Sequence, residues 1–532
     1  MKRIYIDEWM NFKPYKNSGK VDMYYLNLCN EVKARILSGS FAKWAEARTG
    51  FKDMNMLSCF LVSYFEDLIS GTNLWNTFVK KNKELYGKPL PFFPCHTYYE
   101  EEINQEDVCF LIWYCLNCQN DRELLIALDR DIWDVAVEIM KVFEDEWETA
   151  PENERLKSSY DIDANEADYF VAREFLDKLF FRSYLFIPDL SYRLAEEEIE
   201  ILEKDIDAQE TRATLINLRD HALHNYASRL LAFRAVDWAC ELLEENAPIR
   251  AAFENMSRRV QGNFLLKDAS KKHIYLEHIA TGKFIPMSKK SIDRTSYTEE
   301  KNTIIHCGMV RWRDEWWLSG VFAQGPYNVD FVNSDKQSVK SISEFNFLDN
   351  NLIKSVHLLR AQEEAFLAFN DGSPIAFMST NEMKVFTKRF AHFYREKAKN
   401  KLSFFKRMLF KIRERNFSEI DGDLDVSGYE NKGLVFFNPK SGIELAMGVN
   451  SAFPLPSNPF LKEEDSAGEF MFLLIDDSIS TELVMYCVEH CKDNITFLKE
   501  KNGQYLLENI DFVLRFFKKQ RYHTTPEVSF KS

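Results

Sequence analysis

The sequence predicts an α+β protein that is mainly helical, with an N-terminal helical domain, a small central β-barrel-like module and a mixed α/β C-terminal region. Three observations support this prediction. Apolar residues recur every three or four positions over about residues 21–246, the period changes near Val260 to that of short strands, and both patterns alternate after Gly325-Pro326. We therefore expect domains at residues 1–255, 256–330 and 331–532.

The N-terminal domain is predicted to be a set of amphipathic helices. Tyr25, Leu28, Cys29, Val32 and Ile36 have the spacing of one helix face. The longest unbroken apolar stretch runs from residue 108 to 116, far short of the roughly 18 residues that a membrane span requires, so we expect a buried segment.

Two helix starts in this domain carry capping chemistry. Asn104 stands three residues before Asp107, and Asp163 stands three residues before Glu166 and shortly before Phe170. Short polar side chains at these positions can accept hydrogen bonds from the unpaired N–H groups of a helix start. We expect helices to begin after Asn104 and after Asp163.

The central module has the pattern of short strands joined by turns. Strands are predicted at about residues 263–267, 273–278, 283–287 and 304–322, and the last of these contains a turn at Arg313-Asp314-Glu315. This pattern fits a small barrel or meander.

In the C-terminal region we predict helices at residues 361–369 and 381–412 and a hairpin across residues 434–445 that turns at Asn438-Pro439-Lys440-Ser441-Gly442. A strand at 470–475, a helix at 481–491, a strand at 495–498 and a last helix over about 506–519 are predicted to follow.

Composition narrows the class of protein. The chain has 532 residues, 45% of them apolar, and a net charge of −15, so a globular protein is expected and the whole surface is not a nucleic-acid footprint. Asp7 and Glu8 interrupt the segment after Lys2 and Arg3 where a signal peptide needs an apolar stretch. The ten scattered cysteines are typical of reduced, buried thiols. We expect a cytoplasmic protein without a membrane span, disulfide bonds, metal or cofactor.

The sequence contains no nucleophile-elbow, phosphate-binding or dinucleotide-binding motif. An enzyme whose site is assembled from scattered residues stays possible. Cys115 and Cys118 lack the second pair that a zinc site needs. His221 and His224 share a helix face, so a metal-dependent hydrolase stays one alternative. Another alternative is a nucleic-acid-associated protein, or an enzyme whose catalytic carboxylates lie at residues 64–67 or 98–102. Most of the acidic side chains are expected on a solvated face.

One segment has a charge that departs from the rest of the chain. Residues 384–415 contain twelve Lys or Arg and two Glu, a net charge of +10 against −25 elsewhere. Its second half has an apolar stripe, which predicts a basic amphipathic helix for a protein or nucleic-acid partner. Neutralisation by acidic helices of the same chain is an equally weighted alternative. The candidate residues are Lys401, Lys406, Arg407, Lys411 and Arg413.

The Trp-rich hairpin at residues 311–320 is the second candidate recognition surface. Aromatic and guanidinium groups together can stack bases or bind a peptide. The favoured alternative is that these tryptophans fill the core of a small barrel. The candidate residues are Arg311, Trp312, Arg313, Trp316 and Trp317.

Several strings in the first 150 residues resemble an uncharacterised family of Bacteroidetes proteins, domain-of-unknown-function family 3843. These strings are Ile6-Asp7-Glu8-Trp9, Lys13-Pro14-Tyr15, Asp22-Met23-Tyr24-Tyr25, Tyr64-Phe65-Glu66-Asp67 with Leu74-Trp75, and Tyr98-Tyr99 to Trp113, with weaker similarity at 437–444. The resemblance implies a bacterial, cytoplasmic origin and supplies no catalytic positions. The charge asymmetry of the chain motivates our leading hypothesis, a noncatalytic intracellular protein that binds partners through the basic helix or the Trp-rich hairpin.

Overall fold

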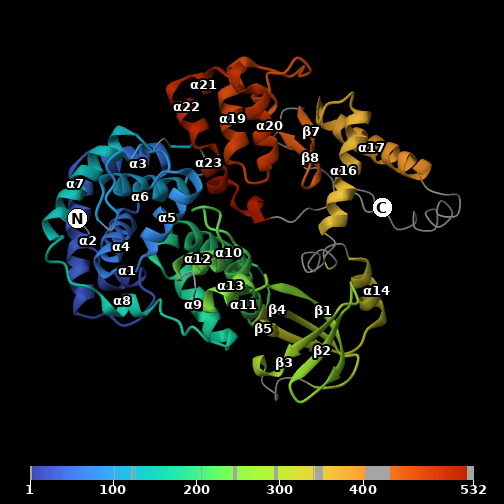
Figure 1. The fold of residues 1–532 in the computed structure, drawn as a ribbon, viewed down its shortest axis with the longest axis horizontal. Coiled ribbons are helices and arrows are strands. Elements are labelled where there is room, and N and C mark those ends of the chain that lie inside the picture. The colour runs from blue at the N-terminus through green and yellow to red at the C-terminus, as the bar shows by residue number, and fades with distance from the viewer. Residues whose placement is uncertain are drawn as a thin grey trace. The chain divides into compact units, whose positions relative to one another are not determined.

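The computed structural model describes residues 3–100, 102–120, 124–125, 127–204, 206–243, 248–292, 298–338, 341, 352–401 and 432–523. The chain forms two compact units, Met1–Phe345 and Asn346–Ser532 (Figure 1). The elements confirm the predicted α+β class, mainly helical with a five-stranded barrel. The division into three domains at residues 255 and 330 stays a prediction.

Helices make up most of the first unit. They are α1 (Ile6–Met10), α2 (Lys20–Ser38), α3 (Phe41–Thr49), α4 (Met54–Ser70), α5 (Leu74–Tyr86), α6 (Gln105–Cys118), α7 (Arg130–Glu146), α8 (Glu154–Ser158), α9 (Tyr169–Phe181), α10 (Tyr192–Leu202), α11 (Ala208–Asn225), α12 (Ala235–Leu242), α13 (Pro248–Glu254) and α14 (Val329–Gln337).

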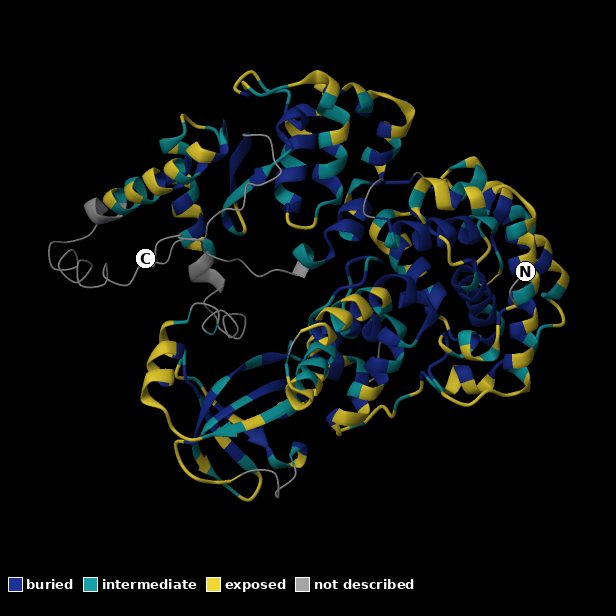
Figure 2. Cartoon of the chain, turned by 180° about the vertical axis from the view of Figure 1, so that it is seen from behind, coloured by how far each residue is buried: buried dark blue, intermediate teal, exposed yellow. Residues whose placement is uncertain are grey.

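Helices α4 and α6 lie at the centre of the core of this unit, where Figure 2 shows dark, buried ribbons. Every residue from Val108 to Leu116 is fully buried, which confirms the predicted buried segment. Within the part of the chain that the structure describes, no helix has the length and apolar content required to cross a membrane.

One of the two predicted helix starts is confirmed and the other is wrong. Asn104 is the residue before α6, although its side chain bonds Tyr99 of the preceding loop and accepts no hydrogen bond from the first N–H groups of the helix. Helix α9 begins after Asp168, whose carboxylate accepts from the Phe170 N–H at 2.8 Å. Asp163 accepts from the Asn165 N–H in a turn that precedes α9. The chain makes this turn before the helix starts at Tyr169.

The central strands close into a barrel. They are β1 (Val260–Ala269), β2 (His273–His278), β3 (Phe284–Ser288), β4 (Ile304–Trp312) and β5 (Glu315–Gly325), in the order β1-β2-β3-β5-β4 with β1 paired to β4. Strands β3 and β5 run parallel and the other pairs are antiparallel. Arg313 and Asp314 have φ of 43° and 65°, as a two-residue hairpin turn requires, so the predicted turn is confirmed.

The second unit combines helices with a small sheet. Its elements are α16 (Leu352–Phe369), β6 (Ile375–Met378), α17 (Thr380–Lys401), β7 (Gly433–Asn438), β8 (Gly442–Met447), α19 (Ser466–Ile475), α20 (Thr481–Cys491), α21 (Thr496–Lys499), α22 (Lys501–Glu508) and α23 (Ile510–Phe517). The antiparallel sheet has the order β6-β7-β8. The predicted hairpin at 434–445 and the helix at 481–491 are confirmed.

Three predictions in this unit are wrong. Residues 470–475 lie in helix α19, and of residues 495–498 the last three form most of the short helix α21. Strands were expected at both places. Short apolar runs do not distinguish a buried strand from a buried helix, which explains both errors. The last helix is two helices, α22 and α23, that are separated at Asn509.

Candidate binding face of the barrel and the network that anchors it

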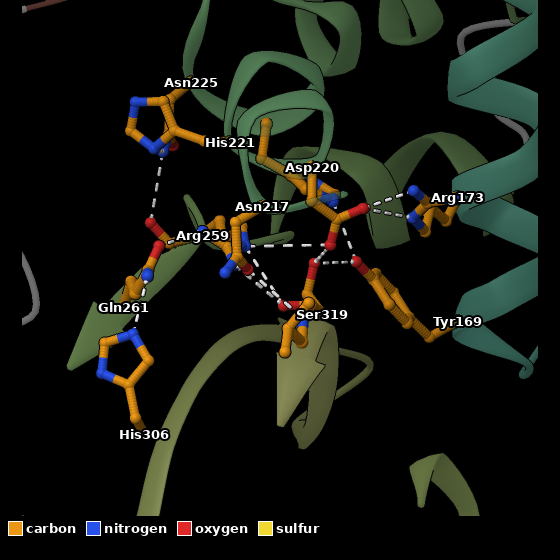
Figure 3. A network of polar contacts seen from close by, with 12 residues as sticks. Tyr169, Arg173, Asn217, Asp220, His221, Asn225, Arg259, Gln261, His306 and Ser319 are labelled. Atoms are coloured by element: carbon orange, nitrogen blue, oxygen red, sulfur yellow. Dashed lines mark hydrogen bonds and ion pairs between the residues drawn. The ribbon is translucent and has the colours of Figure 1, made fainter. Parts of the chain in front are cut away.

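A buried carboxylate, Asp220 on α11, joins the helices of the first unit to the barrel (Figure 3). Arg173 on α9 donates to it from Nε at 2.7 Å and from Nη2, and the Ser319 hydroxyl on β5 donates to its other oxygen. Burial raises the pKa of Asp220, but the Arg173 guanidinium and the hydrogen bonds from Ser319 and Arg173 lower it, and the net direction is below its ordinary value. Asp220 is therefore held as a carboxylate between the two layers.

Arg259, at the residue before β1, is the second buried charge of this network. Its Nε lies 3.7 Å from the Asp220 carboxylate, and its guanidinium donates to the Ser319 carbonyl at 3.1 and 3.2 Å and to Asn217 at 2.8 Å. A Cβ at Gly308 would lie 2.2 Å from Arg259 Nη2, so this glycine leaves the space that the guanidinium fills. The side chain is fully enclosed, as a buried charge with a partner and hydrogen bonds can be.

A chain of hydroxyl groups ends on the same carboxylate. Tyr169 donates to Ser319 Oγ at 2.8 Å, Ser319 donates to Asp220, and His224 Nε2 lies 2.8 Å from the Tyr169 oxygen. This direction assigns the proton of the neutral His224 ring to Nε2. Burial lowers the pKa of His224 to about 3, so the ring is neutral at neutral pH.

The network continues along the outside of the barrel. Arg259 Nη1 donates to Gln261 at 2.8 Å, and the Gln261 amide lies 2.9 Å from the His306 ring, which in turn contacts Asn263 at 2.8 Å. Asn263 donates to Asp335 on α14 at 2.9 Å. Polar groups thus tie β1, β4 and β5 to the neighbouring helices, and none of the residues of this network lies on β2 or β3.

Strands β2 and β3 present aromatic rings to solvent. Tyr275 is 37% exposed and Phe284 is 67% exposed, whereas Ile274, Leu276 and Ile285 between them are buried in the barrel. Tyr275 pairs with Pro286, and Phe284 pairs with Glu277, so the two rings occupy diagonal positions on one face. Diagonal neighbours on adjacent antiparallel strands are roughly 7–8 Å apart. We call Tyr275, Phe284 and His273 the aromatic face.

The surroundings of the aromatic face are positive. Residues 260–325 contain ten Lys or Arg and seven Asp or Glu, a net charge of +3 in a chain of −15. Lys271 and Lys272 are exposed in the β1–β2 loop beside the aromatic face. The two acids nearest to it are paired, Glu277 with Lys267 at 2.7 Å and Asp268 with Lys301 at 3.3 Å.

A family model described as "Protein of unknown function (DUF3843)" matches residues 3–272, just over half of the chain. The chain belongs to the DUF3843 family. No curated protein and no solved structure matches it. The matched residues of the DUF3843 protein include Tyr169, Asp220 and Arg259 and end in the β1–β2 loop, whereas Ser319 and the aromatic face lie beyond them.

The structure places the residues of the Trp-rich hairpin in different environments. Trp312 and Trp317 are buried, against Phe253 and against Tyr169 and Phe170, respectively. Arg313 donates to the carbonyls of Glu166 at 2.7 Å and Ala164 at 3.3 Å. These contacts agree with the alternative that the tryptophans pack in the interior. Trp316 is partly exposed and Arg311 is exposed.

The described part of the predicted basic helix is α17, which ends at Lys401. Its apolar side packs in the core of the second unit, where Met383 and Phe390 are buried with Phe366. Lys388 and Arg389 on the same helix are exposed. Lys406, Arg407, Lys411 and Arg413 lie outside the described residues, as does the side chain of Lys401, so docking through this helix stays a prediction.

The two histidines of the metal hypothesis have separate surroundings. His224 is buried against Tyr169, whereas His221 contacts the Asn225 amide at 2.9 Å and the ring of Tyr226. Over the residues with described positions, no three His, Cys, Asp or Glu side chains are grouped as metal ligands. The ten cysteines are free thiols, and eight of them are buried.

The acidic residues of the enzyme hypothesis have structural partners in the DUF3843 protein. Glu66 pairs with the buried Lys13, and Asp67 accepts from the Trp75 N–H at 2.8 Å at the start of α5. Asp107 accepts from Tyr64 and Tyr98, each at 2.8 Å. Burial raises the pKa of Asp107, and the hydrogen bonds from both tyrosines lower it in part. The net pKa is about 7.

The sequence reasoning missed the aromatic face. The signal was present in the alternation of His273, Tyr275 and Glu277 with Ile274, Leu276 and His278, because successive strand residues point to opposite faces. Asp220 and Arg259 carried no signal of their own, since a charge that is buried between distant elements looks like any surface charge in a sequence.

Proposed function

We propose that the barrel binds single-stranded nucleic acid through the aromatic face. The observation that carries the proposal is the exposure of Tyr275 and Phe284 on adjacent strands of a closed barrel. Base stacking on exposed aromatic rings is worth about 1–3 kcal/mol per base and tolerates any sequence. Unpaired bases expose the faces that such rings require.

Topology supports this assignment. The order β1-β2-β3-β5-β4, with β1 closing on β4 and β3 parallel to β5, is that of the OB-fold. Barrels of this kind bind oligonucleotides and oligosaccharides on the face of strands 2 and 3 and with the loops that flank it. Fold alone does not establish function, so the argument depends on the side chains that this barrel presents.

Charge favours a polyanion over an uncharged sugar chain. Lys271 and Lys272 flank the aromatic face, and the neighbouring Glu277 and Asp268 are neutralised by lysines. The β4–β5 turn is held by Glu166 and Ala164 of the helical part through Arg313. The β1–β2 loop is therefore the flanking loop that we assign to the phosphate backbone.

The test is fluorescence anisotropy of a labelled oligothymidylate with the full-length protein at low salt. Replacing Tyr275 and Phe284 together by Ala removes two stacking platforms and is expected to weaken binding by at least about tenfold. Tyr99→Ala is the matched control. It removes an exposed aromatic ring from the loop before α6, which is far from the barrel in the sequence. Equal affinities of the wild type and the double variant would exclude the aromatic face.

A salt titration separates the backbone contribution from stacking. Each phosphate contact adds about 0.7 to the slope of log affinity against log salt for a single strand. Replacing Lys271 and Lys272 by Gln is expected to reduce this slope by about 1.4 in total if each contacts one phosphate. An unchanged slope would remove the β1–β2 loop from the proposed surface.

A further inference from the structure

A hollow lies in the helical part of the first unit. It has a volume of about 530 Å³ and lies between the segment 6–18, the end of α9 and α11. This volume is within the range of roughly 300–1,000 Å³ that is typical of small-molecule sites. Four of its lining residues are cationic, Lys13, Lys16, Arg182 and Arg219, and Asp7 is acidic. We call this hollow the cationic pocket.

Two guanidinium groups are held side by side at the edge of the cationic pocket. The buried carboxylate of Asp177 contacts Arg182 Nε at 2.9 Å with one oxygen and accepts from Arg219 Nε at 3.2 Å and Nη2 at 3.1 Å with the other. The two arginine side chains are 38% and 41% exposed, so their outer ends reach the solvent of the pocket. The Asp177 carboxylate thus orients both guanidinium groups, and the three side chains together carry a net charge of +1.

The remaining donors of this pair are free to bind a ligand. A guanidinium has five N–H donors, and Asp177 uses only a minority of the ten that the pair provides. Among the described residues, Arg219 donates side-chain hydrogen bonds only to Asp177, and Arg182 makes an ion pair with Asp177. Arg219 also lies over the ring of Phe181 at 5.5 Å, which fixes its plane.

The other cations of the pocket have different roles. Lys13 is buried and pairs with Glu66, so its charge is already matched. Lys16 is exposed and makes no ion pair with any described residue. Lys16 is therefore the lining side chain that adds a positive charge with no acidic partner among the described residues.

We propose that the cationic pocket binds a small phosphate-bearing molecule, with the phosphate between Arg182 and Arg219 and near Lys16. Oriented guanidinium groups match the geometry of phosphate oxygens through two parallel N–H donors, which favours phosphate over a monovalent anion. The pocket volume leaves space for a group of nucleotide size beside the phosphate. This site is independent of the aromatic face and uses other residues.

The test is isothermal titration calorimetry of the full-length protein with inorganic pyrophosphate and with ADP. Binding of either probe is expected, and Arg182→Gln is expected to weaken it by about tenfold or more, the usual cost of a lost charged hydrogen bond. Lys16→Gln, at an exposed site that does not affect folding, is expected to weaken it in the same direction. Tighter binding of ADP than of pyrophosphate would assign the remaining volume to a nucleoside, and equal affinities would assign the site to the phosphate alone.

Arg130→Gln on α7 is the matched control, since Arg130 is 91% exposed and the change removes the same charge outside the pocket. Its affinity for pyrophosphate is expected to equal that of the wild type, as is the affinity of the variant with Ala at 275 and 284. The proposal is overturned if neither probe binds, or if Arg130→Gln reduces affinity as much as Arg182→Gln does.

Discussion

Replacing Asp220 by Asn removes the carboxylate charge that Arg173 and Arg259 share. The Arg259 side chain is fully buried, and its partners besides Asp220 include the neutral oxygens of Ser319, Asn217 and Gln261. Asn keeps the size of the side chain and one oxygen, which can accept from Ser319 or from Arg173. The change therefore tests the charge with little change in packing.

The expected loss follows from these surroundings. Removing one partner of a buried ion pair costs about 3–5 kcal/mol, because the other charge is left uncompensated. Arg173 is 29% exposed and can turn toward water, so most of the cost falls on Arg259. We expect the free energy of unfolding of the first unit to fall by about 3 kcal/mol, at the lower end of that range.

Tryptophan fluorescence measures this loss in the full-length protein. All ten tryptophans, from Trp9 to Trp317, lie within residues 1–345, so their emission during urea unfolding reports on the first unit. The control is Asp134→Asn, which breaks an exposed pair with Arg130 and is expected to cost less than about 1 kcal/mol. A loss for Asp220→Asn no larger than that of the control would refute the reasoning that Asp220 holds the barrel to the helices.

Three further substitutions test the surroundings of the network and the second unit. Gly308→Ala is expected to destabilise the first unit by about 1–3 kcal/mol, because the new Cβ lies 2.2 Å from Arg259; an unchanged urea midpoint would contradict this. The folded-state pKa of His224 is about 3, below its ordinary value, so its stabilising effect is complete above about pH 6.5 and is lost as the pH falls toward 3. The wild type is therefore expected to lose stability relative to His224→Gln between pH 6.5 and 4, and parallel profiles would count against a buried neutral ring. Gly503→Ala places a Cβ 2.2 Å from the Phe497 carbonyl and is expected to lower the unfolding midpoint seen by far-ultraviolet circular dichroism more than that seen by tryptophan fluorescence.

Local patterns in the sequence predicted the barrel well and parts of the second unit poorly. Turn residues and period-two alternation are local signals, and they located β2, β3 and the hairpin at Arg313-Asp314. The stretch at residues 470–475 is apolar on every side, so its helical state in α19 depends on tertiary packing that a short window does not contain.

The candidate site was only partly predictable for the same reason. Trp312 and Trp317 are buried, as the alternative expected, but their rings pack against Phe253 and against Tyr169 and Phe170 of the helices, a contact that the sequence of the hairpin does not reveal. The pairing of Asp220 with Arg259 and of Asp177 with Arg219 joins residues that are 39 and 42 positions apart, on separate elements. Such pairs are set by the tertiary fold and leave no spacing rule in the sequence.

Photo-crosslinking tests the central claim most directly. The full-length protein would be irradiated with a single-stranded oligonucleotide that contains 5-bromouracil, and the modified peptides would be mapped by mass spectrometry. We predict crosslinks at Tyr275 and Phe284, within β2 and β3. Crosslinks confined to other parts of the chain, with none in residues 273–288, would contradict the assignment of the aromatic face as the nucleic-acid surface.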